Sequence, residues 1–164
     1  MLIYLVAVPL VMMACASEAL ENTFNCTATG NGIYGCLFKP EQKKSLTQFL
    51  GQLALHNMQK VTVILKKQKT IGCIKTSEWA NIQAWIKLWT PPKAYIAVFK
   101  SLSKDQRTTI QQAAKNIYDE QLQKKAQAVY DVIIEKHNSL SEADRMTIFE
   151  WNNKCLETCG TIML

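Results

Sequence analysis

Residues 101–110, SLSKDQRTTI, decide the fold of this chain because they recur at residues 139–148 as SLSEADRMTI. Each copy has the form of a helix start. Ser103 is followed three residues later by Gln, which makes a capping box, and Ser141 is followed at the same spacing by Asp, a weaker form of the motif. In both copies the serine oxygen accepts a hydrogen bond from an otherwise unpaired backbone N–H group. The repeat therefore predicts two helix starts and no internal duplication, because the flanking residues scarcely match.

Helical periodicity extends outward from these two starts. Between them the apolar positions shift by about one residue at Asp119-Glu120, which predicts a break or kink there. Upstream, apolar residues recur at threes and fours from Pro40 to about residue 69, which predicts one long helix. A second helix begins after Ser77 and ends before Pro91, because proline disfavours helix in the residue before it. A third, short helix precedes Ser103.

The alternation typical of strands is absent from the sequence, so the predicted fold is all-α. We expect a single disulfide-stabilised bundle of about five to seven helices over residues 40–164. The chain of 164 residues is long enough for one domain of this kind.

The N-terminus is typical of a secretory signal peptide. Residues 2–13 are apolar but too few to span a bilayer, and Ala14-Cys15-Ala16 has the small-x-small pattern of a cleavage site. We therefore expect residues 1–16 to be removed and the mature protein to be secreted and extracellular.

Residues 17–39 are predicted to form a turn-rich leader. Gly30, Gly32 and Gly35 match the spacing of a dinucleotide-binding loop, but no apolar strand precedes them, so we interpret them as an ordinary loop. Asn25-Cys26-Thr27 is a glycosylation sequon, which makes Asn25 a candidate glycosylation site.

Cleavage would leave five cysteines. In an oxidising compartment most thiols pair, so we expect two disulfides and one unpaired thiol. Spacing alone leaves the pairing open. Two cysteines four residues apart on a helix share a face and reach separate partners more easily than each other. The candidates are Cys26, Cys36, Cys73, Cys155 and Cys159.

The formal net charge of +6 predicts attraction to acidic surfaces, such as an acidic membrane or a glycan. Nucleic acid is not an expected partner of a secreted protein, and lysines interleaved with stacking aromatics are lacking. Motifs for a nucleophile with its base, for a phosphate loop or for a metal site are also lacking, with His56 and His137 far from any cysteine pair. The sequence therefore predicts a non-enzymatic protein without cofactor or metal.

Aromatic residues are concentrated between Trp79 and Phe99. Aromatics at helical spacing most often form a core. The alternative interpretation is that short helices interrupted by prolines leave an apolar cavity, where hydrophobic small molecules bind. The predicted cavity lining consists of Trp85, Trp89, Tyr95, Phe99, Ile110, Ile117, Val129 and Ile133. Lys100 or Arg107 would hold the carboxylate of the ligand at the cavity mouth.

Residues 90–155 resemble small secreted helical proteins of nematodes. Pro92, Phe99, Leu102-Ser103, Asp105 and Arg107, with a second motif at Leu140-Ser141 and Ala143, are similar to the pattern of the fatty-acid- and retinol-binding proteins. The spacing from Leu102 to Asp131-Val132-Ile133 resembles that of the SXP/RAL antigens. The first resemblance implies a wide helical fold around a lipid cavity, and the second implies secretion with cation or ligand binding.

Two functions are consistent with these features. The leading prediction is a secreted carrier of fatty acids or retinoids. The alternative is a secreted helical effector, or cytokine-like protein, that acts through its surface on a protein receptor. An enclosed apolar void would favour the carrier, and a packed core with an exposed aromatic patch would favour the surface-acting protein.

Overall fold

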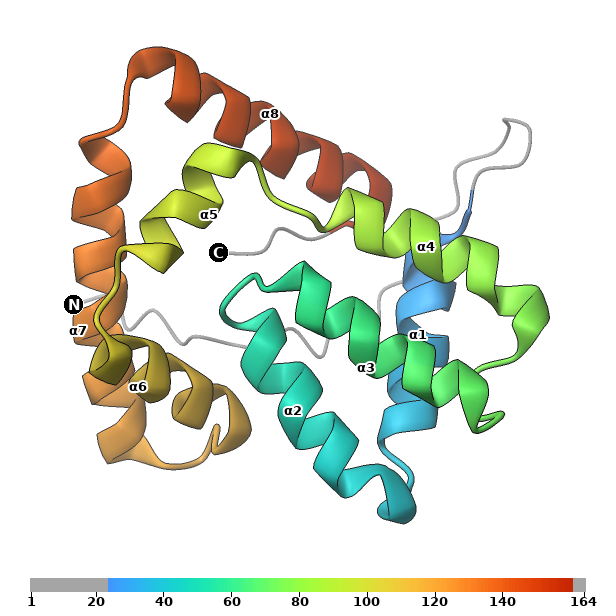
Figure 1. Ribbon diagram of the computed structural model, residues 1–164. Coiled ribbons are helices and arrows are strands. Elements are labelled where there is room, and N and C mark those ends of the chain that lie inside the picture. The colour runs from blue at the N-terminus through green and yellow to red at the C-terminus, as the bar shows by residue number, and fades with distance from the viewer. Residues whose placement is uncertain (1–23, 161–164) are drawn as a thin grey trace.

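The computed structural model describes residues 24–160, in which all regular structure is helical (Figure 1). The predicted signal peptide and its cleavage site lie outside these residues. Two 3₁₀ turns, η1 (Pro40–Gln42) and η2 (Thr76–Glu78), accompany the α-helices. The α-helices are α1 (Cys26–Leu37), α2 (Lys43–Leu53), α3 (Met58–Thr70), α4 (Trp79–Leu88), α5 (Lys93–Lys100), α6 (Lys104–Lys115), α7 (Glu120–Asn138) and α8 (Glu142–Cys159). The all-α, disulfide-tied fold is confirmed, and the described residues contain eight helices where five to seven were expected.

One additional helix is α1, so the prediction of a turn-rich leader is wrong for residues 26–37. The helix begins where Asn25 Oδ1 accepts a hydrogen bond from Ala28 N at 2.8 Å. It is apolar toward the core, where Ile33 and Leu37 are completely buried. Three glycines made this segment a poor helix by propensity, but propensity is a weak guide where tertiary packing and disulfides fix both ends.

The other additional helix arises because the stretch from Pro40 to residue 69, predicted as one helix, is two. The chain turns back between α2 and α3 at His56, whose φ of 50° is left-handed. Asn57 then caps α3, with its Oδ1 accepting from Lys60 N at 3.2 Å. The apolar stripe continued through this turn because both helices bury the same kind of face.

The repeated sequence forms two equivalent helix starts, as predicted. The Ser103 hydroxyl accepts from Gln106 N at 3.1 Å, while Gln106 Oε1 accepts from Ser103 N at 2.8 Å. The Ser141 hydroxyl likewise accepts from Asp144 N at 3.1 Å. These caps end the short connections that precede α6 and α8.

The buried side chains form two clusters. The first lies among α1–α4 and includes Phe49, Leu65 and Trp85; the second lies among α5–α8 and includes Phe99 and Ile110. Trp151 of α8 packs against both. Helix α8 crosses from the α7 side of the molecule to the start of α1 (Figure 1). Helix α8 therefore contacts both halves of the molecule, the half formed by α1–α4 and the half formed by α5–α8, to which it belongs.

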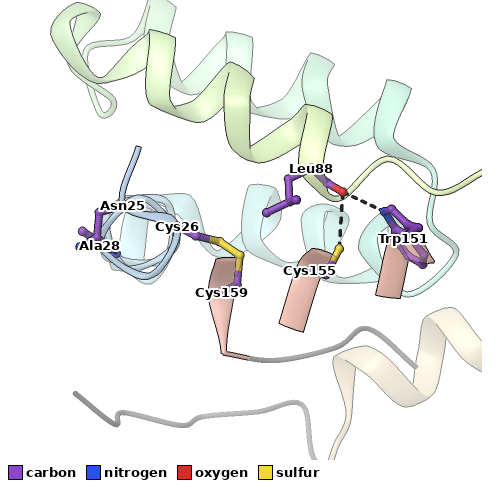
Figure 2. The surroundings of a disulfide bond; sticks show 7 residues. All are labelled: Asn25, Cys26, Ala28, Leu88, Trp151, Cys155 and Cys159. Carbon is purple, nitrogen blue, oxygen red and sulfur yellow. Dashed lines mark hydrogen bonds between the residues drawn. A yellow bond between two sulfur atoms is a disulfide. The ribbon is translucent and has the colours of Figure 1, made fainter. Parts of the chain in front are cut away.

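The end of α8 is tied to α1 and α4 (Figure 2). Cys159 is bonded to Cys26, and Leu88 O accepts hydrogen bonds from Trp151 Nε1 at 2.8 Å and from Cys155 Sγ at 3.6 Å. These contacts join residues 63 to 133 positions apart in the sequence. The halves are consequently fixed to each other by covalent and polar contacts as well as by packing.

Candidate functional site

The residues predicted to line one cavity are divided between the two clusters. Trp85 and Trp89 are buried in the first cluster. Five others fill the second cluster: Tyr95, Phe99, Ile110, Val129 and Ile133. Ile117 belongs to neither and is 45% exposed. Most of these aromatic and aliphatic side chains are therefore core residues packed against one another, and they do not surround one common space.

The two basic residues predicted to hold a carboxylate, Lys100 and Arg107, lie near each other but differ in their contacts. The Arg107 guanidinium donates to Lys100 O at 3.2 Å and to Leu102 O, so it caps the carbonyl end of α5. Arg145, the equivalent residue of the second repeat, donates to Leu140 O at 2.8 Å and so plays the corresponding role after the end of α7. The arginine shared by the two repeats was the signal of this structural role. Lys100 is exposed.

A shallow groove runs between α5 and α7, with a volume of about 680 Å³. Its floor is partly apolar and its rim carries a glutamate and a lysine. The lining residues are Ala97, Val98, Ser101, Val132, Glu135, Lys136, Ser139 and Leu140. The groove is open to solvent, and the predicted lining residues are not part of it.

The cysteines pair as expected in number, with two disulfides and one free thiol among the described residues. The bonds join Cys26 to Cys159 and Cys36 to Cys73. Cys155 is unpaired and fully buried. Burial raises the pKa of its thiol to about 11, although the Lys154 ammonium acts in the opposite direction. This thiol is therefore protonated and unreactive at neutral pH. Asn25, the sequon residue, is exposed beside the first bond.

Charge is distributed very unevenly between the halves. Residues 24–90 contain nine lysines and two glutamates, a net charge of +7. Residues 91–160 contain ten basic and nine acidic residues, a net charge of +1. The total charge conceals this asymmetry, which appears in the sequence once the charge of each half is counted separately.

Seven of the nine lysines gather at one end of the first half, which we call the basic end. It comprises the end of α1, the start of α2, and the end of α3 with the turn that follows it, on the lower right of Figure 1. The Cys36–Cys73 disulfide joins α1 to this turn, and Gln68 Nε2 of α3 donates to Ser45 Oγ of α2 at 3.0 Å. The lysines are Lys39, Lys43, Lys44, Lys66, Lys67, Lys69 and Lys75. All except the half-buried Lys69 are exposed.

The basic end also contains a second groove, with a volume of about 470 Å³. It is lined by two lysines, two threonines and an indole: Lys66, Lys69, Thr70, Thr76 and Trp79. The Lys69 ammonium lies 5.1 Å from the centroid of the Trp79 ring, in a cation–π arrangement. Ammonium and hydroxyl groups around a recess form a suitable seat for an anionic oxygen group.

Two large apolar side chains project from the same end. Phe38, just after α1, is 61% exposed, and Ile71, just after α3, is 53% exposed. They lie two residues after Cys36 and two residues before Cys73, so the disulfide holds their two turns together. Apolar side chains and positive charge therefore occur together at this end.

Fold and surface together define a disulfide-tied, all-helical protein with one strongly basic end. No protein-family model, curated protein or solved structure shows significant similarity to the chain. None of the helices within residues 24–160 has both the length and the apolar composition to cross a membrane. In the same residues, potential metal ligands do not gather into a set of three.

Proposed function

We propose that this chain is an exported, non-enzymatic interaction protein that binds an acidic surface through its basic end. The observation that carries this proposal is the net charge of +5 at one end of one half, where seven lysines outnumber Glu41 and Glu78, while the other half is nearly neutral. Evenly spread lysines would serve solubility equally well. A one-sided distribution instead creates a directed field that attracts and orients an acidic partner.

The position of two of these lysines supports a binding role. Lys43 and Lys44 occupy the first turn of α2, which contains no acidic residue. The positive end of the helix dipole lies there, a position that disfavours a lysine by about 0.3–1 kcal/mol at low ionic strength, and the nearest carboxylate in the sequence is Glu41 in the preceding turn. Residues that weaken the fold where they stand are typical of function, because binding surfaces are often retained at the expense of stability.

The test compares two charge reversals that change the net charge equally. Lys43→Glu/Lys44→Glu alters the basic end, and Lys124→Glu/Lys125→Glu alters an exposed adjacent pair on α7. With heparin as an acidic probe, we expect the first variant to lose at least about tenfold in affinity, since each lysine near an anionic surface contributes about 1 kcal/mol. The control should lose far less. Equal losses in both variants would show that only total charge matters and would contradict the proposal.

The carrier hypothesis is a second proposal, favoured by the groove between α5 and α7. This groove is shallow and open to solvent, and its lining combines apolar side chains with a lysine. Lys136 at its rim would face a carboxylate while Val98 and Val132 contact an acyl chain. The resemblance to fatty-acid- and retinol-binding proteins supports the same ligand class.

A fluorescent fatty acid tests this second proposal. Binding should shift the emission to the blue, oleate should displace the probe, and Ala97→Asp at an exposed position of the groove should abolish the shift. The matched control is Ala128→Asp, at an exposed alanine of α7 outside the groove. Absence of any shift with the unmodified protein would rule the carrier out and leave the first proposal unaffected.

A further inference from the structure

We propose that the acidic surface bound by the basic end is an anionic phospholipid bilayer, into which Phe38 and Ile71 insert. This inference rests on the proposed function and names its partner. A sulfated glycan would satisfy the lysines equally well but offers no apolar phase. The two exposed apolar side chains among the lysines therefore favour a partner that has both anionic groups and hydrocarbon.

The fold holds both side chains outward. Phe38 follows the completely buried Leu37, and its backbone N–H donates to Tyr34 O at 2.8 Å at the end of α1. The backbone N–H of Ile71 donates to Lys67 O at 3.1 Å, and the buried Ile74 lies three residues further on. Because neighbouring residues already occupy the core, neither Phe38 nor Ile71 can turn inward.

One neighbour further restricts Phe38. Its ring stacks on Tyr34, with centroids 5.7 Å apart and an angle of 29° between the ring planes. Tyr34 in turn packs edge-on against the buried Phe49 at 5.8 Å. A side chain that is already ordered loses little conformational entropy on binding, which favours insertion.

The groove beside these side chains suits a lipid headgroup. Lys66 and Lys69 present ammonium groups and Thr76 presents a hydroxyl, while the Thr70 hydroxyl donates to Lys66 O at 3.1 Å. The half-buried Trp79 forms one wall. Indole rings favour the boundary between hydrocarbon and headgroups, where the apolar ring contacts hydrocarbon and the N–H group contacts water or headgroups. The basic end thus offers a recess for a headgroup, lysines for its charge and two apolar side chains for the acyl chains.

The experiment is flotation with vesicles of phosphatidylcholine, with and without phosphatidylserine, together with heparin binding of the same proteins. We expect the protein to float only with vesicles that contain phosphatidylserine. Phe38→Ala/Ile71→Ala should weaken flotation about tenfold, from the lost burial of two partly inserted side chains, and leave heparin binding unchanged. Lys43→Glu/Lys44→Glu should weaken both.

The matched control is Phe149→Ala/Ile134→Ala, which removes a phenylalanine and an isoleucine of similar exposure from α8 and α7. It should float like the unmodified protein. Thermal unfolding of each variant verifies that it is folded, which is expected because surface truncations change stability by less than about 0.5 kcal/mol.

The outcomes separate this inference from the function on which it rests. Lysine-dependent heparin binding without flotation would overturn the bilayer and leave the basic end as a glycan-binding surface. Flotation unaffected by Phe38→Ala/Ile71→Ala would overturn insertion. Failure to bind either probe would overturn both the inference and the proposed function.

Discussion

The imidazole ring of His56 lies edge-on to the ring of Phe99, with centroids 4.7 Å apart. Tyr95 lies 5.0 Å and Trp151 6.3 Å from the same imidazole. His56 therefore anchors the turn between α2 and α3 to α5 and α8 through aromatic contacts. Its Nδ1 is buried without a hydrogen-bond partner. Burial lowers the pKa of His56 from 6.5 to about 4.

Acid should consequently weaken the fold. The unfolded chain binds a proton on His56 below about pH 6.5, while the folded chain resists protonation down to about pH 4. The contribution of neutral His56 to the free energy of unfolding is complete above pH 6.5 and is lost as the pH falls from 6.5 toward 4. At 1.36 kcal/mol per pKa unit, the free energy of unfolding should fall by about 3 kcal/mol across this range. Urea unfolding at several pH values measures it.

The variant that checks the cause is His56→Phe, which keeps an aromatic ring and removes the titration. Its free energy of unfolding should change much less between pH 6.5 and pH 4 than that of the unmodified protein. An equally steep profile in both proteins would show that other groups cause the acid sensitivity.

Phe49 should be among the residues most important for stability. It is completely buried, and its ring centroid lies 5.8 Å from that of Tyr34 and 6.4 Å from that of Trp85. Phe49→Ala should lower the free energy of unfolding by about 3–5 kcal/mol, through lost burial and the remaining cavity. Phe38→Ala, at an exposed position, should change it by less than about 0.5 kcal/mol. Similar losses in the two variants would contradict the burial described here.

Reversing charge at the start of α2 should have the unusual effect of stabilising the fold. Lys44→Glu places a negative charge at the positive end of the helix dipole, which should raise the free energy of unfolding by about 0.3–1 kcal/mol. The measurement is chemical denaturation at low salt, repeated at high salt, where the gain should shrink. A loss of stability would mean that Lys44 makes a structural contact in the fold.

The two disulfides should differ in their contributions to stability. Cys26–Cys159 spans 133 residues and Cys36–Cys73 spans 37. In the chain-entropy account, closing these loops stabilises the fold by about 5 and about 4 kcal/mol respectively. Cys26→Ser/Cys159→Ser should therefore unfold at a lower denaturant concentration than Cys36→Ser/Cys73→Ser. The reverse order would show that local packing outweighs loop length.

Cys155 should resist alkylation until the protein unfolds. Its sulfur is buried and donates to Leu88 O at 3.6 Å, and its pKa of about 11 leaves little thiolate at pH 8. Iodoacetamide should leave Cys155 unmodified in the native protein and label it in denaturant, as peptide mapping would reveal. Rapid labelling of the native protein would contradict this burial.

The local elements were predictable where chemistry between near neighbours fixes them. The serine caps at Ser103 and Ser141, the break at Asp119 and the stop at Pro91 each depend on residues within one helical turn. The helix α1 was not predictable in this way, because glycines oppose it locally. Its stability comes from Cys159 and Cys73, which are distant in the sequence.

For the candidate site, the sequence identified apolar side chains correctly as large and clustered, but it could not assign them to a cavity or to a core. Trp85 and Phe99 satisfy the same periodicity in either case. Likewise Arg107 looked available for a ligand until the carbonyl groups at the end of α5 were placed beside it.

By itself the sequence determined that the chain is helical and where most helices begin and end. These properties follow from backbone hydrogen bonding and periodicity, which act over a few residues. Only the tertiary structure decided which cysteine is free, that the interior divides into two filled clusters, and that seven lysines share one end with Phe38 and Ile71. Those properties depend on contacts between residues far apart in the chain, and these contacts form only when all the helices pack together.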